Sequence, residues 1–107
     1  MMTRLLKFRR ASRSMTSIEA DARLLPSPDV LTARADGAAV LLDLHSEQFL
    51  GLDDTGSTIW SAIESGGSIN TIVSALAEEF DADRAQLEGD ARSFVAELLT
   101  RGLVVLS

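Results

Sequence analysis

Two short runs of alternating apolar and polar residues, followed at once by helical patterns, constrain the fold of this chain more than any other feature. The runs occupy residues 39–44 and 47–52, and a third strand is expected from Val30 to Arg34. A period of two is typical of β-strands, whose successive side chains point to opposite faces. Because Ala35-Asp36-Gly37 and His45-Ser46 supply turn residues between the strands, the segment predicts an antiparallel meander.

Three amphipathic helices are expected after the strands, and each has a recognisable start. Asp53 or Asp54 can cap the first helix, Ser68 the second and Asp83 the third. Side chains of these types accept hydrogen bonds from the free N–H groups of a first helical turn. Gln86 follows Asp83 by three residues, which predicts a capping box at the third helix.

The helices end at Gly66-Gly67 and at Gly102, and Leu103–Leu106 is expected to be a short strand or an extended tail. Apolar residues spaced by three and four form one face of each helix. These residues are Ile59, Trp60 and Ile63, then Ile69, Ile72, Val73, Leu76, Ala77 and Phe80, then Leu87, Ala91, Phe94, Val95, Leu98 and Leu99. The predicted fold is α+β and winged-helix-like, with a three-stranded antiparallel sheet followed by three helices.

Charge divides the chain into two unlike parts. Residues 1–17 hold five of the ten basic residues, whereas the rest of the chain holds five arginines and all sixteen acidic residues, a formal charge of −11. We therefore distinguish a flexible basic N-terminal arm at 1–17, a transitional segment at 18–28 that contains both prolines, and a domain at 29–107. An acidic body repels phosphates, so no nucleic-acid partner is expected. The helix–turn–helix order nevertheless leaves a winged-helix transcription regulator as an alternative.

The basic arm at 1–17 is open to three interpretations. The arm could be disordered, with Met15 as the true translation start. The arm could instead tether an acidic partner electrostatically. A third interpretation is a short amphipathic helix on a membrane surface, built around Leu5, Leu6 and Phe8.

Few residues could support catalysis, metal binding or a cofactor. The chain has no cysteine and a single histidine, His45, so a His-rich or thiolate metal site is excluded. The acidic pairs at 53–54 and 81–83 are interpreted as helix caps, and the serines at 57, 61 and 65 as solvated. No metal, cofactor or catalytic residue is therefore expected. The lack of cysteine indicates a cytoplasmic protein, and no apolar run is long enough for a membrane span.

The strand at 47–52 and the third helix have more apolar surface than one core needs. In the strand, Phe49 lies on one face and Leu50 and Leu52 on the other, and the third helix is apolar over a wide arc. An exposed strand edge has unpaired N–H and C=O groups and can accept an extended peptide as an added strand. We therefore expect the outer edge of the 47–52 strand to be exposed and to bind a peptide.

Three motifs give the chain a resemblance to the PqqD-like family, the recognition elements for precursors of ribosomally synthesised and post-translationally modified peptides. Leu52 to Trp60 (LDDTGSTIW) resembles the family pattern that opens the first helix, with Asp53 where the family often has Asn. Ser68 to Val73 (SINTIV) resembles the start of the second helix, and Phe94 to Val104 (FVAELLTRGLV) the end of the third. The resemblance covers residues 29–106, and the chain is most similar to the stand-alone proteins of lasso-peptide biosynthesis.

The resemblance implies a non-catalytic domain that holds the leader of a precursor peptide as a β-strand between the third strand and the third helix. Such proteins work beside a transglutaminase-like leader peptidase and an ATP-dependent cyclase. An alternative is a PQQ-type chaperone that presents its precursor to a radical-SAM enzyme. The candidate peptide-binding residues are Glu47, Gln48, Phe49, Leu50, Gly51, Leu52, Ala91, Phe94 and Leu98.

Overall fold

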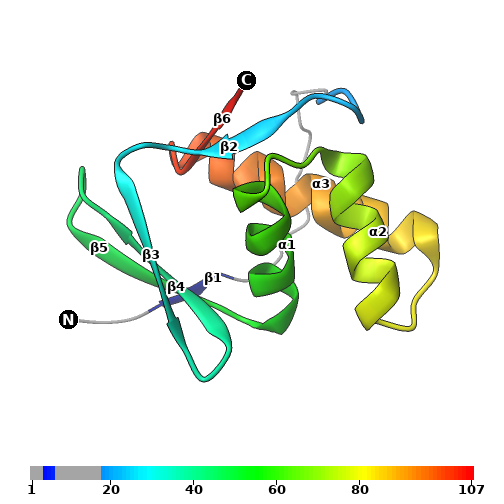
Figure 1. Ribbon diagram of the computed structural model, residues 1–107, viewed down its shortest axis with the longest axis horizontal. Coiled ribbons are helices and arrows are strands. Elements are labelled where there is room, and N and C mark those ends of the chain that lie inside the picture. Colours follow the sequence, from blue (N-terminus) through cyan, green and yellow to red (C-terminus); the bar gives the residue numbers. More distant parts are fainter. Residues whose placement is uncertain (1–3, 7–17) are drawn as a thin grey trace.

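A sheet on one side and three helices on the other make up the fold in the computed structural model (Figure 1), which describes residues 4–6 and 18–107. The strands are β1 (Arg4–Leu6), β2 (Leu24–Pro26), β3 (Val30–Ala35), β4 (Ala38–Asp43), β5 (Gln48–Leu52) and β6 (Val104–Leu106). The helices are α1 (Asp54–Glu64), α2 (Ile69–Glu79) and α3 (Arg84–Thr100). The predicted α+β class and the order of strands before helices are confirmed.

The strands β3, β4 and β5 form the predicted antiparallel meander. Thr32 pairs with Leu41, and Leu41 pairs in turn with Leu50. The turn between β3 and β4 takes positive φ at Asp36 (54°) and Gly37 (84°), as a tight hairpin requires. The expected three-stranded antiparallel sheet is therefore confirmed.

A fourth strand joins this sheet, and it corrects one expectation. β1 pairs in parallel with the outer edge of β5, so the strand order is β1-β5-β4-β3. The edge of β5 that the sequence predicts to be exposed is thus paired with a segment of the same chain. The remainder of the predicted flexible arm at 1–17 lies outside the described residues.

The helix starts follow the predicted caps at two of three positions. The Asp53 carboxylate accepts a hydrogen bond from the Gly56 N–H at 2.8 Å, and Ser68 forms a capping box with Thr71. The capping box predicted for Asp83 and Gln86 is wrong, because the Asp83 side chain makes no cap hydrogen bond. Both of these residues are exposed, so solvent can satisfy the first N–H groups of α3 without them.

A second, two-stranded sheet ties residues 18–28 to the end of the chain. β2 pairs antiparallel with β6, with Leu24 opposite Leu106 and Pro26 opposite Val104. The Leu24 N–H also donates to the Gly67 carbonyl at 2.9 Å. The predicted terminal strand is therefore present, and the segment expected to be transitional supplies its partner.

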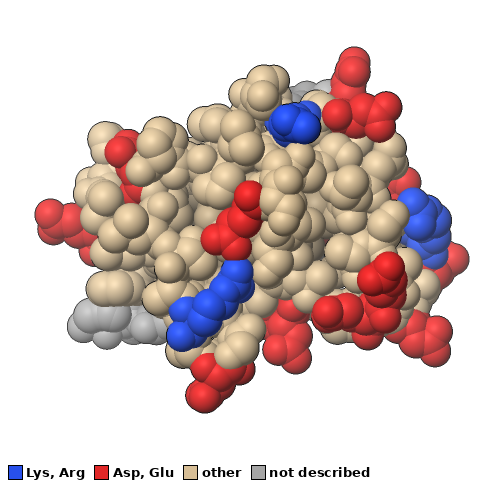
Figure 2. Space-filling model, viewed as in Figure 1, with Lys and Arg blue, Asp and Glu red and all other residues tan. Residues whose placement is uncertain are grey.

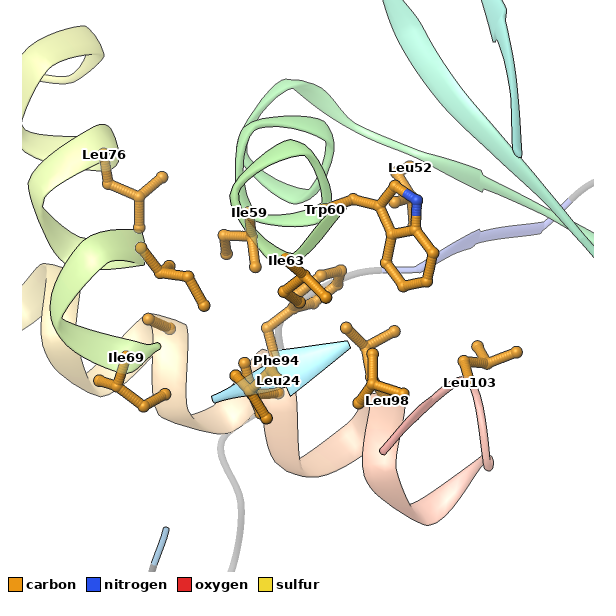
Figure 3. Close-up of a cluster of buried hydrophobic side chains, with 14 of the residues drawn as sticks. Leu24, Leu52, Ile59, Trp60, Ile63, Ile69, Leu76, Phe94, Leu98 and Leu103 are labelled. Atoms are coloured by element: carbon orange, nitrogen blue, oxygen red, sulfur yellow. The ribbon is translucent and has the colours of Figure 1, made fainter. Parts of the chain in front are cut away.

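The core lies between the sheet and the helices, and Figure 3 shows side chains from α1, α2, α3, β2 and β5 converging there. Trp60 is fully buried, as its place on the apolar stripe predicts, and its Nε1–H donates to Thr32 Oγ1 at 3.0 Å. Of the apolar positions expected in α2, Ala77 is exposed. Within residues 4–6 and 18–107, no helix is long and apolar enough to span a membrane.

Replacing Leu24 with Ala tests whether β2 belongs to the core. Leu24 is 0% exposed, whereas its neighbour Leu25 on the same strand is 37% exposed. We expect Leu24→Ala to lower the free energy of unfolding by about 2–5 kcal/mol, because it leaves a cavity. The matched control Leu25→Ala should cost less than about 1 kcal/mol. Urea unfolding followed by circular dichroism measures both, and equal losses would contradict this packing.

Candidate functional site

The candidate peptide-binding residues of β5 are set in place by the hairpin with β4. Phe49 pairs with Leu42 and Gln48 with Asp43. Glu47 lies in the turn before the strand with a φ of 60°, and its N–H donates to the Asp43 carbonyl at 2.7 Å. The tight turn fixes the register of β5, and the register decides which side chains face the helices.

The two faces of β5 have different surroundings. Leu50 and Leu52 are buried in the core, and Gly51 between them is also buried. Phe49 lies on the opposite face and is 43% exposed. A peptide strand added beside β5 would therefore direct alternate side chains toward the helices and toward the Phe49 face.

Phe49 belongs to a row of apolar side chains on the outer face of the sheet. Leu31, Leu42 and Phe49 are directly opposite one another on β3, β4 and β5, so their side chains point the same way. Leu31 is 53% exposed. We call these three residues the outer row, and only its Phe49 end adjoins the edge of β5.

The residues predicted on α3 lie beneath the surface of the described chain. Ala91, Phe94 and Leu98 are all buried, with Phe94 1% exposed, and Figure 3 shows Phe94 and Leu98 pointing into the core cluster. The sequence analysis assigns these three residues to one side of a peptide site between β5 and α3, and we call them the floor of that site. We call the predicted site itself, bounded by the outer edge of β5 and by α3, the slot.

Gly56 allows Phe94 to reach the junction between β5 and α1. A Cβ added at Gly56 would lie 3.1 Å from Phe94 Cζ and 3.3 Å from Leu52 Cβ, which is closer than ordinary van der Waals contact. The small residue at this place in the LDDTGSTIW motif therefore has a packing reason. It lets α3, α1 and the end of β5 approach one another.

Ser57 is a structural residue of the site that the sequence analysis missed. It is buried, its Oγ accepts a hydrogen bond from the Ala39 N–H at 2.8 Å, and it donates to the Leu52 carbonyl at 3.3 Å. The expectation that Ser57 is solvated is wrong. Its burial could have been predicted from its position three residues before Trp60, which places both residues on the buried face of α1.

The remaining polar candidates lie on the surface. Ser61, Ser65 and His45 are exposed, as expected. Among residues 18–107, no three His, Cys, Asp or Glu side chains gather in a group that could hold a metal ion. The predicted slot consists of a strand edge and apolar side chains, which are the groups that bind an extended peptide by strand addition.

A polar cleft of about 710 Å³ lies apart from the slot, between α1, α2 and the β3–β4 turn. Arg34, Thr58 and Glu79 are among its lining residues, and neither β5 nor α3 contributes to it. Arg34 pairs with Glu64 at 2.6 Å, and Thr58 donates to Glu79 at 3.1 Å. The polar groups named here already have partners within the protein.

Acidic side chains outnumber basic ones over the described surface. On the face in Figure 2 they lie mainly around the margins, and the basic groups are few and separate. Phosphate binding needs a continuous basic patch. The face in Figure 2 shows no such patch.

Comparison with known proteins gives one family and two closely similar structures. The family model for coenzyme PQQ synthesis protein D (PqqD) matches residues 38–104. The structure of TbiB1 in complex with the TbiA(beta) leader peptide has 38% sequence identity to this chain and a TM-score of 0.71. The match covers 75% of this chain and 93% of that chain. The structure of lasso peptide synthetase B1 complexed with the leader peptide has 27% sequence identity to this chain and a TM-score of 0.69. The match covers 77% of this chain and 96% of that chain. No curated protein matches the chain.

Removing the Ser57 hydroxyl tests its role in holding the end of β5. Ser57→Ala leaves the buried Ala39 N–H without its partner, so we expect the free energy of unfolding to fall by about 1–3 kcal/mol. Ser61→Ala makes the same chemical change at an exposed position of the same helix and should cost less than about 0.5 kcal/mol. Denaturant titration distinguishes the two variants. Unchanged stability in Ser57→Ala would contradict the assigned role.

Proposed function

This chain belongs to the PqqD family, as a recognition element of the lasso-peptide type, and we propose that it binds the leader of a ribosomally made precursor peptide in the slot. The leader adds to the outer edge of β5 as a further strand and lies against α3. The protein holds its substrate and makes or breaks no covalent bond. The reaction belongs to the enzymes to which the precursor is delivered.

The observation that carries this proposal is the likeness to two proteins solved with a leader peptide bound. TbiB1 shares 38% of its residues with this chain over 93% of its own length. At that identity and coverage, a binding mode is expected to be shared along with the fold. Further support comes from the apolar residues on both faces of β5.

In the proposed mechanism, main-chain pairing supplies affinity and side-chain contacts supply selectivity. The backbone of Glu47 to Leu52 pairs with the leader. Leader side chains on the inner face meet the floor formed by Ala91, Phe94 and Leu98, and those on the outer face meet Phe49. The expected dissociation constant is about micromolar to tens of nanomolar, or roughly −8 to −10 kcal/mol.

Delivery to a transglutaminase-like leader peptidase, and from there to a cyclase, is the role we propose for the complex. A paired leader exposes its outward side chains next to the outer row, which makes a composite surface for a partner enzyme. The lack of cysteine supports a reducing cytoplasm as the place where this happens.

Phe49→Ala tests the slot with a matched control in the outer row. Both Phe49 and Leu31 are exposed and apolar on one face of the sheet, but only Phe49 adjoins the slot. We expect Phe49→Ala to weaken binding of a labelled TbiA(beta) leader peptide by about 5- to 30-fold, or ~1–2 kcal/mol. Leu31→Ala should change it by less than about 2-fold. Fluorescence anisotropy measures the affinities, and circular dichroism checks that both variants are folded.

Equal effects of the two substitutions would show that the peptide does not bind along β5. No saturable binding by the unsubstituted protein, up to a peptide concentration of about 1 mM, would contradict leader recognition of this type.

A further inference from the structure

The three residues of β1 occupy the strand edge that the proposed function assigns to the leader. Arg4 lies opposite Leu50, Leu5 opposite Gly51 and Leu6 opposite Leu52, all in parallel register. β4 holds the other edge of β5. A strand has two edges, and each accepts one partner at the usual spacing of about 4.8 Å. β1 and a leader therefore cannot pair with these residues of β5 at the same time.

We propose that β1 is a tethered occupant of the slot, which covers the β5 edge in the free protein and is displaced when a leader binds. This inference rests on the proposed function for the leader, but the pairing of β1 is a separate observation. It makes leader binding an exchange of one strand for another rather than an addition to a bare edge.

The attachment of the arm keeps β1 close to the slot. Ile18, where the continuous described chain begins, is buried, and its carbonyl accepts a hydrogen bond from the Arg92 guanidinium on α3. Eleven residues, 7–17, join Ile18 to β1. Because β1 belongs to the same chain as β5, their pairing is intramolecular and does not depend on the concentration of the protein.

Electrostatic attraction also favours the pairing of β1 with the edge of β5. The arm contains Arg4, Lys7, Arg9, Arg10 and Arg13 and no acid, whereas the rest of the chain has a formal charge of −11. Opposite charges attract across the surface, and salt at physiological strength screens this attraction beyond about 8 Å. Of these basic residues Arg4 belongs to β1, so charge favours keeping β1 beside the acidic remainder of the chain.

The shortness of β1 allows it to be displaced. It pairs over three residues, whereas β5 is five residues long. A leader that pairs over the whole strand makes more main-chain hydrogen bonds than β1 does. The measured dissociation constant rises by the inverse of the fraction of protein with a vacant slot. If β1 covers about nine-tenths of the molecules, leader affinity is about tenfold weaker than the slot itself would give.

A double proline substitution, Leu5→Pro with Leu6→Pro, removes the pairing and leaves the charge unchanged. Hydrogen bonding alternates along a strand, so two adjacent prolines eliminate the donor whichever residue supplies it. The hydrophobic core of the described chain lies within residues 18–104, so the variant should fold. Ala11→Pro with Ser12→Pro, outside β1, is the matched control.

Hydrogen exchange measures the pairing without any peptide. In the full chain and the control, the β5 amides that do not bond to β4 should be protected. They should exchange at least about tenfold faster in the Leu5→Pro/Leu6→Pro variant. Equal exchange of these amides in the three proteins would overturn the self-pairing.

Titration with the TbiA(beta) leader peptide measures the competition. The Leu5→Pro/Leu6→Pro variant should bind about tenfold more tightly than the full chain, and the control should match the full chain. Equal affinity in the two proteins would overturn the competition, even if the exchange experiment shows pairing. If the exchange rates differ but neither protein binds the peptide, the proposed function fails, the self-pairing stands, and the exchange of β1 for a leader is overturned with that function.

Discussion

The outer edge of β5 is paired with β1, and the proposed function depends on whether a leader peptide can take the place of β1 there. Unpaired backbone N–H and C=O groups on a strand edge invite pairing with any extended chain. The rest of the molecule presents this edge in a fixed register. The β4–β5 hairpin sets the register, and the buried core holds the inner face of β5 against the helices.

The junction between β5 and α1 explains why one short motif is so informative. Asp53 caps α1, Gly56 admits the Phe94 ring, Ser57 bonds to both β4 and the end of β5, and Trp60 fills the core. Four residues of LDDTGSTIW thus join the sheet to α1 and α3. A motif of this kind reports a packing arrangement, in which the end of β5, α1 and α3 meet.

The sequence predicts the meander and the helices because their signals are local. Alternation marks β3 to β5, and Asp53 and Ser68 act as caps one turn from the groups they bind. β1 and β2 have no such signal, since each is three residues long and pairs with a distant segment. Asp83 and Gln86 have the spacing of a capping box, but exposure to solvent removes the need for one. Of the site, the sequence predicts that β5 has apolar residues on both faces, but not that β1 lies on its edge.

The proposed self-pairing also gives β1 a physical role that composition alone left open. A bare, partly apolar strand edge is a liability for aggregation, and a short charged strand protects it at small energetic cost. A peptide must also bind the edge of β5 more strongly than β1 does in order to displace it. Selectivity then comes from the length of main-chain pairing as well as from side-chain contacts.

The most direct test is to observe the peptide in the slot. Isotope-edited nuclear Overhauser measurements on the full-length protein with a labelled TbiA(beta) leader report which backbone amides the peptide touches. The account predicts contacts in a strand pattern along Gln48 to Leu52, with loss of those from Arg4 to Leu6. Contacts along the free edge of β3, or in the polar cleft beside Arg34, would contradict it.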